Sequence, residues 1–249
     1  TTIARTVTSL QINAGGTLDI FNSTGHNFGA VSGKGTLRLN TLTFPSGDFT
    51  NFVSSDGGTV EYYNVSGTLQ QNIYNNLIIK KRDNNATNYN ITLGTNLSVN
   101  GSFSLMRQLG TGTLTFTIGN GATALDINIY GNLTVGTGCY IYTNVTNVVH
   151  TMSIYGDLTN NGTIRFTNRT PPVINNYYIN DPTNGVVNVT FKGASDNTVR
   201  CYGTTDFNRF IVDKGVDQTY ILTLTSSNVQ NFRVFGRNDQ QATDFHLIV

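Results

Sequence analysis

The pentapeptide "GTLDI" at residues 16–20 decides the fold, because it returns four times along the chain. The later copies are "GTLRL" at 35–39, "GTVEY" at 58–62, "GTLTF" at 112–116 and "GTIRF" at 162–166. In each copy a glycine, which readily adopts positive φ, precedes a β-branched threonine and two apolar residues separated by one other residue. Such alternation is typical of a half-buried strand that follows a tight corner.

The composition argues against helices. The 249 residues include 38 threonines, 33 asparagines and 26 glycines, but only eight alanines and one glutamate, Glu61. Threonine favours strands, whereas asparagine and glycine favour turns, and the best helix formers are nearly missing. We therefore expect a chain of strands and turns with almost no helix.

The repeat has a measurable period when each motif is read together with the apolar stretch before it. Three such units begin at Leu10, Val31 and Val53, which are 21 and 22 residues apart, and a second set begins at Leu109, Leu133 and Leu158, which are 24 and 25 residues apart. Self-similarity at this period marks a solenoid, whose units bury a core only by stacking. We predict an all-β, right-handed parallel β-helix of roughly ten or eleven coils, spaced at about 4.8 Å.

An antiparallel β-sandwich, or a pair of them, is the alternative fold, because turn signals every 8 to 12 residues suit a sandwich as well. The solenoid is predicted to span residues 1–249 as one unit, with loop interruptions near 70–92 and 167–184. Loops that project from a solenoid often carry function. Tyr177 and Tyr178, beside the second loop, could stack on a sugar or simply pack.

Charge is sparse and balanced, with 15 basic and 14 acidic side chains and a net charge of +1. Nucleic-acid binding needs clustered basic groups, and only the run "KKR" at 80–82 qualifies. We interpret that run as a solvated turn after the strand "NLII". Asp19, Arg38 and Glu61 take equivalent outward positions in successive repeats, which predicts charge pairing between coils.

No catalytic, metal or cofactor site is predicted. The thirteen aspartates are scattered, without the close carboxylate pair that glycoside hydrolysis requires. His26, His150 and His246 lie far apart and outside metal-ligand spacing. Cys139 and Cys201 are predicted to be buried small side chains, with a single disulfide between them as the alternative.

The Thr-x-Thr pattern at 113–117 raises the further alternative of an ice-binding face, which needs ranks of threonines over several coils. Only one repeat shows the tripled pattern. No apolar run approaches the roughly 18 residues that span a bilayer. The chain begins at Thr1 without a basic-then-apolar leader, as expected of a processed protein or an excerpt of a longer chain.

The stretch "GGTVEYYNVSGTLQQNIYNNLIIKK" at 57–81, followed by "NITLGTNLSVNGSFSL" at 90–105, resembles repeats in long surface proteins of the Bacteroidetes. Those proteins are similar in plan to filamentous-haemagglutinin-type β-helices, and many are adhesins exported by type IX secretion, some of them used in gliding motility. The carboxyl-terminal sorting domain of exported members is not recognisable in "NDQQATDFHLIV". The resemblance supplies no catalytic residues.

We therefore expect a non-enzymatic structural or adhesive segment of a secreted or bacterial cell-surface protein. It would act as a stiff stalk that presents side-chain ladders and loops to surface glycans or neighbouring cells, and it could associate with its own copies end to end or laterally. No nucleic-acid partner is expected. The alternative is a carbohydrate-active β-helix, either a polysaccharide lyase or a glycoside hydrolase, and a cluster of charged groups across adjacent coils beside a groove would favour it.

Overall fold

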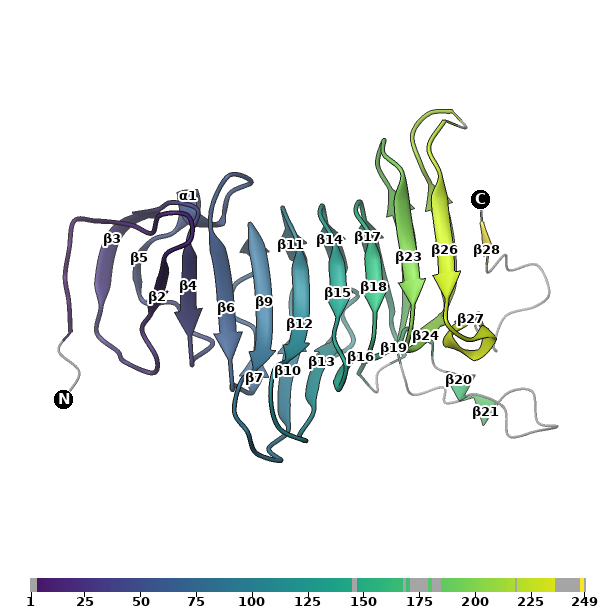
Figure 1. Ribbon diagram of the computed structural model, residues 1–249, viewed down its shortest axis with the longest axis horizontal. Helices are drawn as coiled ribbons and strands as arrows, with labels where there is room; N and C mark the ends of the chain where they lie inside the picture. Colours follow the sequence, from purple (N-terminus) through teal and green to yellow (C-terminus); the bar gives the residue numbers. More distant parts are fainter. Residues whose placement is uncertain are drawn as a thin grey trace.

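The chain winds into a rod of stacked β-coils, and its sequence runs from one end of the rod to the other (Figure 1). The computed structural model describes residues 4–144, 147–167, 169–170, 179–180, 185–217, 219–235 and 247–248. One helical turn, α1 (Thr50–Val53), and one 3-10 turn, η1 (Val229–Asn231), are the helices in that part of the chain. All of the long sheets are parallel, which confirms the predicted parallel β-helix.

The longest wall is a nine-stranded parallel sheet, with one strand from each of nine coils. In spatial order its strands are β2 (Thr17–Asp19), β4 (Thr36–Leu39), β6 (Thr59–Tyr63), β9 (Asn76–Lys81), β12 (Phe103–Arg107), β15 (Leu133–Val135), β18 (Leu158–Asn160), β23 (Asn197–Cys201) and β26 (Leu222–Ser226).

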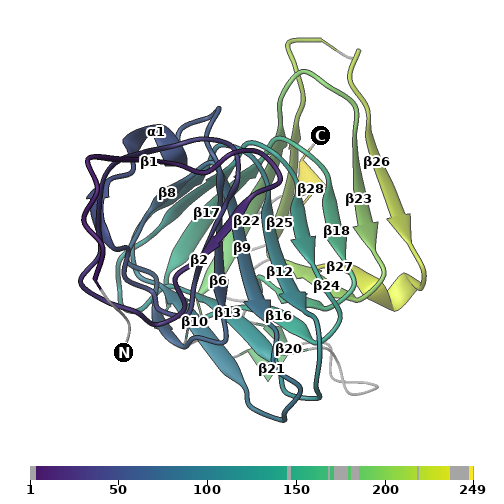
Figure 2. The same cartoon turned by 60° about the vertical axis from the view of Figure 1, so that its left-hand side comes forward.

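Two seven-stranded parallel sheets complete the walls. The β7–β27 sheet contains β7 (Gly67–Thr68), β10 (Tyr89–Leu93), β13 (Leu114–Ile118), β16 (Cys139–Thr143), β19 (Thr163–Arg165), β24 (Thr204–Phe207) and β27 (Phe232–Val234). The β8–β28 sheet contains β8 (Ile73–Tyr74), β11 (Leu97–Val99), β14 (Asp126–Ile129), β17 (Val149–Ile154), β22 (Val186–Lys192), β25 (Arg209–Asp213) and β28 (Leu247–Ile248). A regular coil visits the β7–β27 sheet, then the β8–β28 sheet, then the nine-stranded sheet (Figure 2).

The first coils are built differently. A three-stranded parallel sheet of β1 (Ser9–Gln11), β3 (Asn27–Ser32) and β5 (Ser46–Asp48) takes part in place of the two longer sheets. Near the other end, β20 (Arg169–Thr170) and β21 (Ile179–Asn180) form an antiparallel pair. No described helix is long and apolar enough to cross a membrane.

The core is a set of columns in which equivalent apolar residues stack from coil to coil. In the nine-stranded sheet one inward column runs through Leu18, Leu37, Val60, Leu77, Phe103, Leu133, Leu158, Val199 and Leu224. The column is fully buried in the middle coils, whereas Leu18 and Leu224, at its two ends, are partly exposed. Each coil therefore buries its apolar face only because a neighbour covers it, as predicted for a solenoid.

The five Gly-Thr motifs do not occupy one wall. The first three begin β2, β4 and β6 in exact register, but the copies at 112–116 and 162–166 form β13 and β19 in the β7–β27 sheet. Their shared feature is the corner before the strand. A Cβ on Gly35, Gly112 or Gly162 would collide with a backbone oxygen of the neighbouring coil, so only glycine permits this approach.

Two sequence expectations change in the structure. Residues 70–92, predicted to interrupt the repeat, contain β8, β9 and most of β10, and the polar loop is confined to 82–88. The repeat is hard to recognise here because the coil lengths are unequal. The step along the column is 17 residues from Val60 to Leu77 and 26 residues from Leu77 to Phe103. The stretch 167–184, with Tyr177 and Tyr178, lies largely outside the described residues, and β17 pairs directly with β22 across it.

A ladder of polar side chains follows the corner that leads into the nine-stranded sheet. Each member except the last, Thr198, accepts a hydrogen bond from the backbone N–H of the equivalent residue in the next coil, at 2.8–3.2 Å. The ladder runs through Asn76, Ser102, Asn132, Asp157 and Thr198. It satisfies backbone donors that the strand ladders leave unpaired at the corner.

Candidate functional site

A surface groove of about 550 Å³ lies where two parallel stacks fail to join. The three-stranded sheet ends at β5, the β8–β28 sheet begins at β8, and no ladder connects them. The turn of α1 packs between these elements, against β3 and β8. The groove is lined by Phe44, Pro45, Gly47, Asp48, Phe49, Thr50, Val53, Ser54, Gln71, Asn72 and Ile73.

The groove combines aromatic, amide and carboxylate groups. The rings of Phe44 and Phe49 pack with centroids 4.8 Å apart, and Ile73, which also lines the groove, is 48% exposed. Hydrogen bonding to Thr50 lowers the pKa of Asp48, whose Oδ1 accepts from the Thr50 N–H at 3.0 Å. An apolar surface flanked by a few convergent polar groups is the general form of a small-ligand site.

Sequence analysis did not identify these groove residues. Their signal is nevertheless visible, because "TLTFPSGDFTNF" at 41–52 breaks the repeat with a proline and three phenylalanines. That segment forms β5, the following turn and most of α1. In this segment the sequence departs from the repeat, and several of its side chains line a groove instead of joining the core columns.

The predicted charge pairing between coils is confirmed on the outer face of β2, β4 and β6. Arg38 lies between two acids, with Nε 2.9 Å from Glu61 Oε1 and Nη1 3.5 Å from Asp19 Oδ2. Arg82 approaches the same two carboxylates at 3.7 and 4.0 Å, and its guanidinium lies over the ring of Tyr63. Glu61 points outward as expected, but these neighbours bury it.

This cluster has the arrangement of a structural network. Asp19 Oδ1 also accepts hydrogen bonds from the Tyr63 hydroxyl at 3.2 Å and the Phe21 N–H at 3.0 Å. Glycoside hydrolysis needs one carboxylic acid that donates a proton and a second carboxylate free to act as base or nucleophile. Here both acidic groups serve as acceptors for the same two arginines.

A serine and a histidine meet at the N-terminal end of the rod. Ser23 Oγ lies 2.8 Å from His26 Nε2, and both residues line two adjacent hollows. His26 Nδ1 accepts the Arg5 backbone N–H at 3.2 Å, so the proton of the neutral ring is assigned to Nε2. A histidine in this tautomer donates to the serine and cannot remove its proton, which argues against a catalytic dyad.

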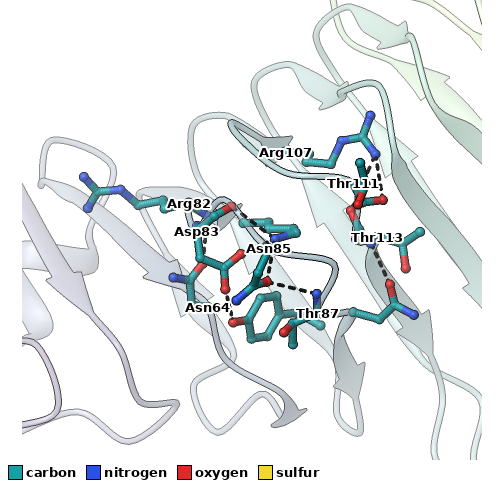
Figure 3. Close-up of polar contacts among 12 residues, drawn as sticks. Asn64, Arg82, Asp83, Asn85, Thr87, Arg107, Thr111 and Thr113 are labelled. Carbon is teal, nitrogen blue, oxygen red and sulfur yellow. Dashed lines mark hydrogen bonds and ion pairs between the residues drawn. The ribbon is translucent and has the colours of Figure 1, made fainter.

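The "KKR" run at 80–82 is not a solvated turn. Lys80 and Lys81 end strand β9, and the Lys81 side chain is fully buried. The loop 82–88 folds over it, so that Lys81 Nζ donates to the carboxylate and backbone oxygen of Asp83 and to Asn85 Oδ1 at 3.3 Å. Figure 3 shows the side chains of Asp83 and Asn85 close together on this loop.

The buried lysine determines how the loop 82–88 closes. Asp83 is the ion-pair partner of Lys81 and accepts a hydrogen bond from the Tyr89 hydroxyl. Burial, together with that hydrogen bond, raises the pKa of Tyr89 to about 12. Asn64 Oδ1 anchors the loop by accepting the backbone N–H of Arg82 at 2.7 Å (Figure 3). The prediction of a solvated turn was wrong because strand β9 continues through Lys80 and Lys81.

The threonines at 113–117 belong to a short column only. Thr115 and Thr117 point outward from β13, and in the Thr117 column the neighbours are Thr92 and Thr68 on one side and Tyr142 on the other. Thr113 lies just outside the strand. The rank of threonines therefore covers three coils and ends at a tyrosine.

The remaining candidates are buried. His150 is in β17 with no exposed surface, and burial lowers its pKa, while Nδ1 accepts the Leu125 N–H at 3.0 Å. Cys139 and Cys201 are free and buried, as predicted, and burial raises the pKa of Cys139 to about 11 and that of Cys201 as well. The part of the chain that is described holds no group of three side chains suited to a metal ion, and His246 lies outside it.

Comparisons with known proteins identify no relative: no family model, no curated protein and no solved structure matches the chain.

Proposed function

We propose that this protein is a non-enzymatic structural and adhesive segment of a secreted or bacterial cell-surface protein. It acts as a stiff stalk and attaches to surface glycans through the groove beside α1. The observation that carries the proposal is the nine-stranded sheet, in which every strand from β4 to β23 is paired in parallel on both sides. An uninterrupted ladder resists bending, because its strands can separate only by breaking backbone hydrogen bonds.

The outward charges support the same function. Beyond Asp19, Arg38 and Glu61, acids meet arginines of other coils at two further places. Arg200 Nη1 lies 2.7 Å from Asp157 Oδ2, and Arg233 contacts both oxygens of Asp206 at 2.7 and 2.9 Å. Charges used in this way hold one coil to another.

The groove supplies the adhesive part of the proposal. Phe44 offers a ring surface, and Asp48 and Gln71 offer polar groups in the same lining. Sugars present apolar C–H faces and a rim of hydroxyls, which this combination matches.

The test is a glycan array probed with the complete chain, with depolymerisation of polysaccharides assayed on the same set. We expect binding without turnover. The double variant Asp48→Ala/Gln71→Ala should weaken binding at least about tenfold, which corresponds to about 1.4 kcal/mol. Asn84→Ala, at an exposed position in the loop 82–88, is the matched control and should bind like the wild type.

Two results would contradict the proposal. The absence of binding to every glycan would refute its adhesive part. Turnover of any polysaccharide would refute its non-enzymatic part and favour the carbohydrate-active alternative, for which the charged cluster around Arg38 is the specific observation. Asp19→Asn and Glu61→Gln would then identify the carboxylates responsible, because each removes one negative charge from that cluster.

A further inference from the structure

Lys214 is a buried lysine that reaches back into the preceding coil. It follows β25, is 8% exposed, and its Nζ donates to the backbone oxygen of Lys192 at 2.8 Å and to Asn197 Oδ1. Asn197 opens β23, and its side chain lies near Asp157, just before β18. The Asp157 carboxylate also accepts the Thr198 N–H at 2.8 Å and pairs with Arg200 at 2.7 Å. A lysine, an asparagine and an aspartate therefore line up across three successive coils.

The surroundings of the Lys214 amine favour its neutral form. Among the described residues no carboxylate lies within ion-pair distance of Nζ. Burial lowers the pKa of Lys214, outweighing the attraction of Asp196 and Asp157 at longer range. Since a lysine becomes a nucleophile only when it is neutral, desolvation favours the reactive form.

We propose that Lys214 and Asn197 form an isopeptide bond without an external enzyme. The Nζ lone pair attacks Cγ of Asn197, and the carbonyl π electrons move to Oδ1. When the tetrahedral centre collapses, the Cγ–Nδ2 bond breaks and the nitrogen leaves as ammonia. The proton lost by Nζ goes to Nδ2, with the nearby Asp157 carboxylate as the group that relays it.

The atoms and charges of this reaction balance. One lysine ammonium and one asparagine amide give one secondary amide and one ammonium ion. No oxidant, reductant or metal takes part. The exchange of one amine for another on an amide is slow in water, but holding the two groups in contact can be worth an effective concentration of about 10⁵ M or more. A single turnover per molecule is enough.

Lys81 provides an internal comparison. It too is buried and lies 3.3 Å from an asparagine oxygen, Asn85 Oδ1. Its Nζ, however, is ion-paired with Asp83, a carboxylate partner that Lys214 lacks among the described residues. We therefore expect no bond between Lys81 and Asn85.

The bond would join coils near the C-terminal end of the rod. Lys214 and Asn197 are 17 residues apart; Lys214 lies in the corner between β25 and β26, and Asn197 opens β23 in the preceding coil. β26 is the last strand of the nine-stranded sheet and is paired only with β23. A covalent link at this corner would fix the last coil to the one before it. Such a bond does not depend on glycan binding by the groove.

The test is the intact mass of the complete chain after incubation at mildly alkaline pH, followed by protease digestion and tandem mass spectrometry. We expect the wild type to be lighter than its sequence mass by one ammonia molecule, with a branched peptide that joins Lys214 to Asn197. Lys214→Met and Asn197→Ser should show their full sequence masses. Lys81→Met is the matched control and should keep the deficit, and Asp157→Ala should slow its appearance.

Succinimide formation at an asparagine also releases ammonia, but hydroxylamine opens a succinimide and leaves an isopeptide bond intact. A wild-type chain that keeps its full mass would overturn the proposal, and so would a deficit that hydroxylamine removes. The branched peptide is sought in the wild type itself, so the result does not depend on whether Lys214→Met folds.

Discussion

The middle of the rod and its N-terminal end are built from the same repeat but differ in regularity. From β9 to β19 each coil supplies one strand to each of three walls, and the inward columns are fully buried. Before β7 the chain uses a separate three-stranded sheet, inserts α1, and leaves hollows lined by residues 5–73. Regular stacking therefore provides buried core, whereas departures from it create concave surface.

The largest expected effect tests whether stacking on both sides sets the stability of a coil. Leu133 and Leu18 occupy the same column, but Leu133 lies between Phe103 and Leu158 while Leu18 has only Leu37 beside it. We expect Leu133→Ala to lower the free energy of unfolding by about 3 to 5 kcal/mol, because a buried cavity forms. Leu18→Ala should cost less than half as much in the same urea titration. Equal losses would show that the ends are packed as tightly as the middle.

The second prediction compares a buried ion pair with an exposed one. Asp83→Ala leaves the Lys81 ammonium buried without its counter-charge, and we expect a loss of about 3 kcal/mol. Asp56→Ala removes the partner of Lys34 in an exposed pair, in which the Lys34 side chain is 65% exposed and that of Asp56 is 93% exposed. This variant should leave the unfolding curve unchanged.

A double-mutant cycle completes this test. The pair Lys81→Met/Asp83→Ala should recover most of the stability lost in Asp83→Ala, because no unpaired charge remains buried. Failure to recover would mean that Asp83 acts mainly through Tyr89 and the loop rather than through Lys81.

The third prediction concerns the polar ladder, which runs through the middle coils. Asn132 Oδ1 accepts the Asp157 N–H at 2.8 Å at an exposed corner, and Asn132→Ala removes that hydrogen bond. We expect a loss of about 0.5 to 1.5 kcal/mol in thermal or urea unfolding. Asn22→Ala, at an exposed N-terminal position, is the control and should change stability little. An equal change in both variants would remove the ladder as a source of stability.

The smallest expected effect is a pH dependence from His150 in the middle of the rod. Burial holds the pKa of this histidine below its ordinary value of about 6.5, so the unfolded chain binds the proton more readily than the folded chain. The contribution of His150 to the free energy of unfolding should therefore be complete above about pH 6.5 and fall as the pH drops below it. His150→Leu should show a smaller decline between about pH 7 and 5 than the wild type, measured by urea titration at each pH.

Much of the fold could be predicted because its signals are local. The alternation of Leu37 and Leu39 around Arg38 marks a strand, and glycine before threonine marks the corner before it. The period then requires stacking, since no single unit buries its own apolar face. The pairing of Arg38 with Asp19 and Glu61 followed from the same register, because equivalent positions of parallel strands lie side by side.

The sequence by itself thus determined the kind of strand, the corner chemistry and the stacking of coils, because these depend on residues a few positions apart. Which wall each Gly-Thr motif enters depends on the three-dimensional packing, since coil lengths vary from 17 residues between Val60 and Leu77 to 41 between Leu158 and Val199. It also decided that Lys81 is enclosed and Lys214 meets Asn197, because burial of a side chain depends on which neighbouring coil covers it. The groove beside α1 has the same origin, as it exists where one sheet ends and another begins.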